Sequence, residues 1–139
     1  MKPKDVKFRG KSKRTGEWLY GDLVRNVEGT FAVVPPFEMT TDNLCDRYEV
    51  DEKTIGQFTG LKDFNDNEIY DGDILKESMN DAKLLVRWSD NNGSFCLSGI
   101  VEDLQFYYDF PLGKEFLRRF SMGIVGNRWD MPELSNLKG

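Results

Sequence analysis

The segment TIGQFTGLKDFNDNEIYDGDIL, residues 54–75, decides the fold class because it places glycines and turn-forming acidic and amide residues between apolar runs. Glycine adopts positive φ without steric cost, and Asp and Asn side chains bind nearby backbone N–H groups, so both types mark turns. An earlier segment, WLYGDLV at residues 18–24, has a similar ending. In both, Gly-Asp is followed by two aliphatic residues. We therefore expect structural turn residues at Gly21, Asp22, Gly60, Asp71, Gly72 and Asp73.

Apolar residues recur with a period of two through most of the chain, as they do in half-buried β-strands. The segments VKFRG, GTFAVVP, KLLVRW and GSFCLSGI, at residues 6–10, 29–35, 83–88 and 93–100, follow this strand pattern. The connectors TGE at 15–17 and SDNNG at 89–93 are typical of hairpins. One or two short helical turns are expected between residues 102 and 120, and a short terminal one capped by Asp130.

Many short strands with closely spaced glycine turns indicate an all-β protein with minor helix. Residues 60–139 are sufficient for one SH3-like small β-barrel of about five strands. Residues 1–59 predict an N-terminal β-hairpin-rich extension with few apolar residues of its own. Because an isolated hairpin is marginally stable in water, we expect this extension to pack on the barrel, to form one compact unit with it, or to pack on a neighbouring subunit.

The composition argues against catalysis. The 139 residues include no histidine, which removes Ser-His-Asp and Cys-His nucleophilic systems and His-ligated zinc sites. Neither a Walker motif nor a GxGxxG loop is present. Cys45 and Cys96 are far apart and lack a CxxC partner, so we expect two small buried thiols rather than a zinc site or a disulfide. We therefore expect neither enzymatic activity nor a cofactor.

The predicted location is the bacterial cytoplasm. No apolar run reaches the roughly 20 residues that a membrane-spanning helix needs. The first residues, MKPKDVKFRGKSKR, are charged and lack the apolar region of a signal peptide. No membrane association is expected.

Three motifs carry a resemblance to a known family: EWLYGDLV at 17–24, IGQFTGLKDFNDNEIYDGDIL at 55–75 and GIVGNRWDMPEL at 123–134. They resemble the YopX-like family of phage and prophage proteins over nearly the whole chain, most weakly at 30–50 and 102–118. Asp66-Asn67 stands where the family commonly has Asn-Gly, and Met131-Pro132 where it has Asn-Pro. The resemblance implies an SH3-like barrel for the second half and a setting in a phage or an integrated prophage. The family supplies no established biochemical activity and therefore no catalytic residues to assign in this chain.

A cluster of carboxylates in the middle motif needs its own interpretation: Asp63, Asp66, Glu68, Asp71 and Asp73. Asp63, Asn65 and Asn67 match the first three ligand positions of a calcium loop, but Glu68 occupies the glycine position and Ile74 the position of the final glutamate. A metal-dependent hydrolase would also use such carboxylates. We expect instead that they serve the backbone geometry of turns.

The charge is unevenly distributed. Residues 1–25 carry eight lysines and arginines against three acidic residues, whereas the whole chain has a net charge of −5. This basic arm, with its neighbouring aromatic residues, is a candidate nucleic-acid face, although it would also suit a solvated strand face or an acidic surface of a neighbouring copy. The candidate contacts are Lys7, Arg9, Lys11, Lys13 and Arg14.

Aromatic residues accumulate between positions 106 and 120, in excess of what one face of a small barrel can bury. Aromatic-rich protrusions mark interfaces, although these rings would also serve to cap an open barrel end. The candidate interface residues are Phe106, Tyr107, Tyr108, Phe110 and Phe116. We therefore expect a non-enzymatic accessory protein that acts through protein–protein contacts as a homo-oligomer, with a host or phage protein as a further partner. The alternative is a small nucleic-acid-binding barrel that uses the basic arm.

Overall fold

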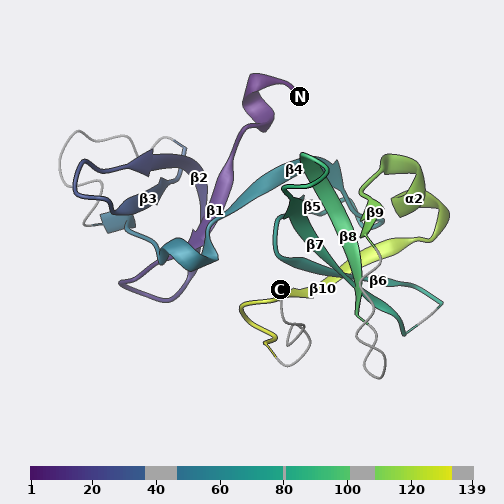
Figure 1. Ribbon diagram of the computed structural model, residues 1–139. Coiled ribbons are helices and arrows are strands. Elements are labelled where there is room, and N and C mark those ends of the chain that lie inside the picture. The colour runs from purple at the N-terminus through teal and green to yellow at the C-terminus, as the bar shows by residue number, and fades with distance from the viewer. Residues whose placement is uncertain (37–46, 80, 101–108, 133–139) are drawn as a thin grey trace. The chain divides into compact units, whose positions relative to one another are not determined.

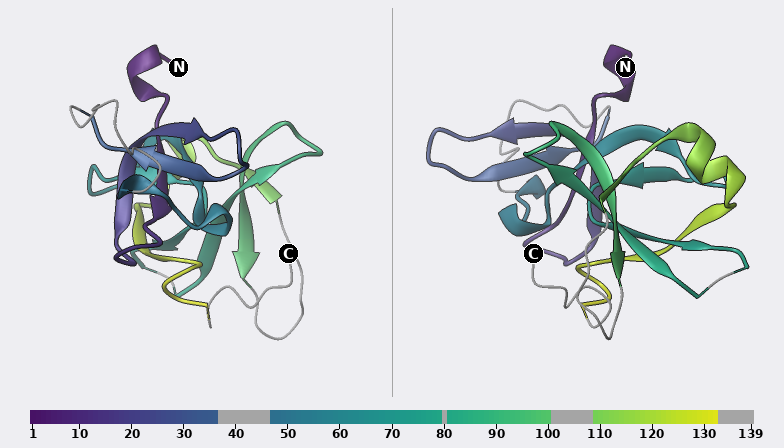
Figure 2. Two further views of the ribbon diagram at one scale, coloured as in Figure 1. Left: turned by 90° about the vertical axis from the view of Figure 1, so that its left-hand side faces the viewer. Right: turned by 45° about the vertical axis from the view of Figure 1, so that its right-hand side comes forward.

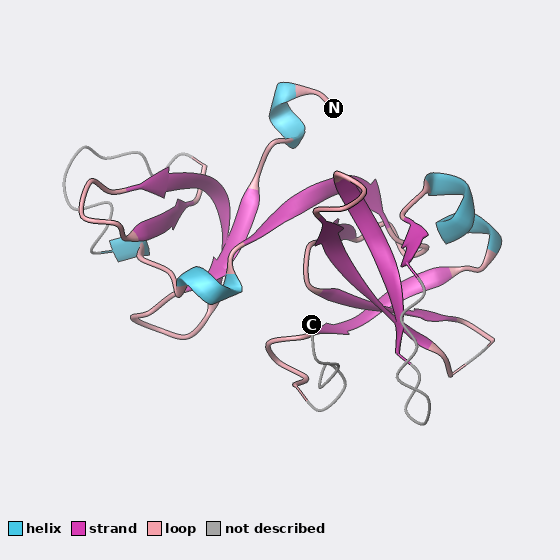
Figure 3. Cartoon of the chain, in the orientation of Figure 1, coloured by secondary structure: helices cyan, strands magenta, loops and turns pink. Residues whose placement is uncertain are grey.

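The structure is a computed structural model that describes residues 1–36, 47–79, 81–100 and 109–132 (Figure 1). Antiparallel strands dominate it, and a short helix, α2, follows the ninth strand (Figure 3). The expectation of an all-β protein with minor helix is confirmed. The chain divides into two units, Met1–Phe58 and Thr59–Gly139, which are described separately below.

The first unit is built from three short strands and the beginning of a fourth. Its elements are η1 (Pro3–Asp5), β1 (Phe8–Lys11), β2 (Trp18–Arg25), β3 (Phe31–Val34), η2 (Glu52–Thr54) and the start of β4 (Gly56–Lys62). β1 and β2 form the predicted hairpin, with Lys11 opposite Trp18 and Gly16 in the connecting turn at φ 75°. β2 also pairs with β3, and β1 with β4, both antiparallel.

The core of the first unit is small, as its composition suggested. Ala32, Val34 and Tyr48 form its buried centre, and Leu19 and Val24 pack against them. All three members of the centre are at most 9% exposed. The segment GTFAVVP thus forms one short strand, β3, in which every residue after Phe31 is buried.

The second unit contains the end of β4 and the rest of the sheet structure. Its other elements are β5 (Glu68–Tyr70), β6 (Asp73–Glu77), β7 (Lys83–Ser89), β8 (Ser94–Ile100), β9 (Asp109–Pro111), α2 (Lys114–Arg119) and β10 (Met122–Asn127). One sheet has the strand order β10-β6-β7-β8-β9, and the other, β3-β2-β1-β4-β5, ends in this unit. Figure 2 shows the ribbon from two further sides. The SDNNG segment is the β7–β8 hairpin connection, as predicted, with Ser89 opposite Ser94.

One face of the β10-β6-β7-β8-β9 sheet carries the core of the second unit. Val86 and Leu97 are directly opposite each other in the β7–β8 register, and both are fully buried. The complete cluster is Ile69, Leu75, Val86, Leu97, Leu117 and Met122. Leu117 comes from α2, so the apolar side of this helix packs against the core cluster.

The pairing leaves both sheets open, so the expectation of a closed SH3-like barrel is not confirmed. Within the described strands, β5 ends one sheet and β10 ends the other. The loop after β4 approaches β10 through two contacts: the N–H of Phe64 donates to the carbonyl oxygen of Met122, and the N–H of Ile124 donates to Oδ2 of Asp63. A side chain therefore replaces part of the backbone ladder that closure would need.

Candidate functional site

The Gly72–Asp73 corner joins β5 to β6 and has the geometry expected of a structural turn. Gly72 has a φ of 95°, which favours glycine. Asp73 is 2% exposed, and its Oδ2 accepts a hydrogen bond from the N–H of Tyr70 at 2.7 Å. The N–H of Gly72 donates to the oxygen of Val86, and its own oxygen accepts from the N–H of Arg128. The carboxylate and both backbone groups thus hold the corner in place.

The loop between β4 and β5 is organised by Asp63, which is 7% exposed. Its Oδ1 accepts from the N–H groups of Asn65 and Asn67 at 2.9 and 2.8 Å, and its Oδ2 accepts from Ile124 at 2.9 Å. Asp66 adopts a φ of 67°, in the region that Asp and Asn tolerate. The first position of the considered calcium loop is therefore already saturated by backbone donors. Within the described residues, no three acidic, cysteine or histidine side chains are arranged to hold a metal.

Gly21, Asp22 and Gly60 occupy different positions from those expected. Gly21 and Asp22 lie inside β2, and Gly60 lies inside β4 at a φ of 86°, so none of the three is at a turn between strands. A Cβ on Gly21 would run into the carbonyl oxygen of Val34. Gly21 therefore permits a close approach of two backbones, and the expectation of a turn at residues 21 and 22 is corrected.

Three cations of the basic arm lie over aromatic rings. The Lys7 Nζ is 4.8 Å from the centre of the Phe58 ring, and Arg9 and Lys11 are 4.7 and 5.5 Å from the Trp18 ring. Arg9 is only 4% exposed. The structure therefore brings together three of the predicted contacts on one side of β1, with their charge already directed at ring faces.

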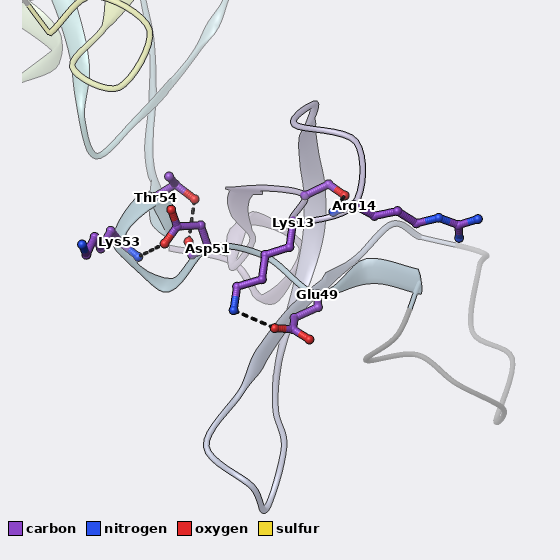
Figure 4. Close-up of polar contacts among 7 residues, drawn as sticks. Lys13, Arg14, Glu49, Asp51, Lys53 and Thr54 are labelled. Carbon is purple, nitrogen blue, oxygen red and sulfur yellow. Dashed lines mark hydrogen bonds and ion pairs between the residues drawn. The ribbon is translucent and has the colours of Figure 1, made fainter.

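Lys13 and Arg14 lie at the other end of the hairpin and differ from these three. Lys13 Nζ forms an ion pair with Oε2 of Glu49 at 2.9 Å (Figure 4). The hydrogen bond to Glu49 and its charge raise the pKa of the Lys13 ammonium above its ordinary value. Arg14 is exposed, and its backbone N–H donates to Oγ of Ser12. The acidic segment of the same unit thus neutralises part of the basic arm.

The aromatic segment is only partly within the described residues. Phe106, Tyr107 and Tyr108 lie outside them. The Phe110 ring, on β9, stacks on the Phe116 ring of α2 with 6.0 Å between the ring centroids. The Phe116 and Phe120 rings are tilted against each other, with 4.9 Å between their centroids. Phe110 is 38% exposed, whereas Phe116 and Phe120 pack against the core cluster. The row of rings therefore begins at the surface and continues into the core.

One exposed aromatic residue, Phe64, is not among the residues predicted from the sequence. Phe64 is 60% exposed, the largest fraction for an aromatic side chain among the described residues. The signal was present, since an aromatic residue stands alone in the polar run KDFNDNE. The interpretation of that run as a turn gave this aromatic residue no role of its own. Cys96 is a buried free thiol, as expected, and Cys45 lies outside the described residues.

These observations define a class: a small antiparallel β protein in which the buried carboxylates of Asp63 and Asp73 accept hydrogen bonds from the backbone of turns. The chain belongs to the YopX protein family, whose family model matches residues 7–135, and this confirms the resemblance seen in the motifs. No curated protein matches the sequence. Within the described residues, no helix has the length and apolar character needed to cross a membrane.

Proposed function

We propose that this protein is a non-enzymatic, cytoplasmic accessory protein of a phage or prophage that acts through protein–protein contacts as a homo-oligomer. The single observation that supports this proposal best is the row of contacting aromatic rings that runs from β9 along α2. Phe110 is 38% exposed at its outer end, and Phe116 and Phe120 anchor the row on the core. Aromatic side chains that are rigidly supported and partly exposed are favoured at interfaces.

Light scattering over a range of concentrations tests the homo-oligomer. We expect more than one copy per particle at high micromolar concentration, and a shift towards monomer for Phe110→Ser. Val27→Ser is the matched control, because Val27 is fully exposed and belongs to the first unit. A wild-type chain that stays monomeric throughout this range would contradict the proposal.

We also propose that the second unit has an SH3-like barrel topology. The resemblance of its motifs and the contacts of Asp63 and Phe64 with β10 support this. In solution, a closed barrel predicts nuclear Overhauser effects between backbone protons of β5 and β10. If such effects are confined to the loop at residues 63–65, the unit is an open pair of sheets.

A second candidate function, nucleic-acid binding by the first unit, has the half-buried cations of Lys7 and Lys11 and the half-buried ring of Trp18 in its favour. Arg9 and Phe58 are 4% and 3% exposed and are not available for such contacts. Aromatic rings flanked by cations stack on bases of single strands. Lys7→Glu combined with Lys11→Glu should then abolish a salt-sensitive gel shift of a single-stranded oligonucleotide. Lys53→Glu in η2 is the control variant. The absence of a shift for the wild-type chain at low salt would dismiss this function.

A further inference from the structure

We propose that Asn92, in the turn between β7 and β8, is a site of spontaneous deamidation in the folded protein. Asn92 is followed by Gly93, and no other asparagine of the sequence is followed by glycine. The side-chain amide carbon of an asparagine can reach the next backbone nitrogen, and glycine is the residue that leaves this nitrogen unshielded, because it has no Cβ. The modification requires no enzyme and converts a neutral amide of the hairpin into a carboxylate.

The reaction proceeds through a cyclic imide. The backbone nitrogen of Gly93 loses its proton to solvent and forms a bond to Cγ of Asn92. The Cγ–Nδ2 bond then breaks, and Nδ2 takes up a proton and leaves as ammonia. Water opens the resulting succinimide at either of its carbonyl groups. Opening at Cγ leaves aspartate at position 92, whereas opening at the main-chain carbonyl leaves isoaspartate, and neither route involves an oxidant or a reductant.

Solvent has direct access to this dipeptide. Asn92 and Gly93 are both exposed. Gly93 has a φ of 61°, and a Cβ built on it would meet no atom within 4 Å, so the backbone around it has room to rearrange. Asn127 shows the opposite situation: it is 9% exposed, and its Oδ1 accepts hydrogen bonds from the N–H groups of Trp129 and Asp130. Exposure and the following glycine therefore coincide at Asn92.

The hydrogen bonds of the turn control how fast the ring can close. The N–H of Gly93 donates to the carbonyl oxygen of Ser89 at 2.8 Å, and the N–H of Asn92 donates to Ser89 Oγ at 3.3 Å. The Asn92 Nδ2 donates to Cys96 Sγ at 3.5 Å. The attacking nitrogen and the side chain that it attacks are thus both engaged with other groups, so the turn must open first. Opening an exposed turn costs less free energy than global unfolding, which makes the folded chain slower than the unfolded chain but still reactive.

Incubation of the full chain at mildly alkaline pH tests the site. Peptide mapping by mass spectrometry should find aspartate and isoaspartate at residue 92 before any other asparagine is modified. Asn92→Gln should remove the first acidic species on isoelectric focusing, because the longer side chain closes a ring much more slowly. Asn91→Gln is the matched control, since Asn91 is an exposed neighbour that is followed by asparagine, and it should leave the rate unchanged. A folded chain that stays intact at residue 92, or that is modified first at another asparagine, would overturn the proposal.

Ser89→Ala tests whether the turn controls the rate. The change removes the Oγ that accepts from Asn92, so deamidation of the folded chain should become about fivefold faster, whereas the rate in guanidinium chloride should stay the same. Ser98→Ala is the control, because Ser98 is also buried but lies further along β8, opposite Leu85, and should not change the rate. No acceleration by Ser89→Ala, or an equal acceleration by Ser98→Ala, would overturn control by the turn.

Discussion

The same motif, Gly-Asp followed by two aliphatic residues, occurs at residues 21–24 and at residues 72–75. The two occurrences have different structural roles. Gly72 and Asp73 form a corner between strands, with positive φ at the glycine and a buried, hydrogen-bonded carboxylate. Gly21 and Asp22 lie inside a continuous strand, where the glycine is buried and the carboxylate is exposed. The motif alone therefore does not determine a turn.

The residues before the dipeptide explain the difference. Asp71 precedes Gly72 and gives the chain two residues between β5 and β6 in which to reverse direction. Gly21 follows Tyr20 directly, and the strand continues while β3 pairs alongside it. Gly72 is needed for its φ of 95°. Gly21, with a φ of 157°, is needed also for its lack of a side chain, because the Val34 backbone lies against it. Substitutions at the two sites should separate these roles.

The largest effect is expected for Gly21→Ala. The added methyl group would overlap the carbonyl oxygen of Val34 and come within 2.9 Å of the Pro35 Cα, and backbone atoms cannot move aside as a flexible side chain can. We expect the free energy of unfolding to fall by about 3 kcal/mol. Chemical denaturation followed by fluorescence measures it. Gly16→Ala is the control: its methyl group would meet no atom within 4 Å, so only the cost of its φ of 75° applies. Equal losses for both variants would refute the steric role of Gly21.

The next largest effect is expected at Asp73. Asp73→Ala leaves the N–H of Tyr70 without this acceptor in a buried place, which should cost about 2 kcal/mol of unfolding free energy. Asp22→Ala changes the corresponding residue of the other copy at an exposed position, and should stay within about 0.5 kcal/mol of the wild type. Denaturant titrations of the three proteins make the comparison. Similar losses at both sites would mean that the carboxylates have the same role.

Gly72→Ala should have a smaller effect than Gly21→Ala. Here the cost is that of holding a residue with a Cβ at a φ of 95°, about 1 to 2 kcal/mol. Thermal unfolding should show a lower Tm. Gly72→Asn should lose less, because asparagine tolerates positive φ better than alanine does. A wild-type Tm for Gly72→Ala would show that the corner relaxes without cost.

Much of the strand pattern was predictable because it depends on local alternation. The hairpins at residues 15–17 and 89–93 follow from glycine-containing connectors between alternating segments, and the structure confirms both. The position of Gly21 inside a strand depends on Val34, which belongs to a different strand. No local pattern reveals that contact, so the similarity to residues 72–73 was misleading.

The candidate site shows the same division between local and non-local information. That Asp63 would bind nearby N–H groups was predictable from the run of Asp and Asn residues around it. Its hydrogen bond with Ile124 joins residues 61 positions apart and was not predictable. The ion pair between Lys13 and Glu49 also joins residues far apart in the sequence and was not predictable. It partly neutralises the charge of one of the five expected nucleic-acid contacts.

The smallest effect concerns this ion pair, which tests how far the first unit depends on charge. Glu49 raises the pKa of Lys13 in the folded state, so the pair stabilises the fold from neutral pH up to the pKa of an unfolded lysine. The contribution is lost as the pH rises through the raised pKa of the folded state. We therefore expect Lys13→Met to lower the Tm slightly at neutral pH, and the difference from the wild type to disappear at strongly alkaline pH. Roughly 1 M salt should also reduce it, because Lys13 is exposed. Glu49→Gln should behave like Lys13→Met, and a difference that persists at high pH would assign the effect to packing of the lysine chain instead.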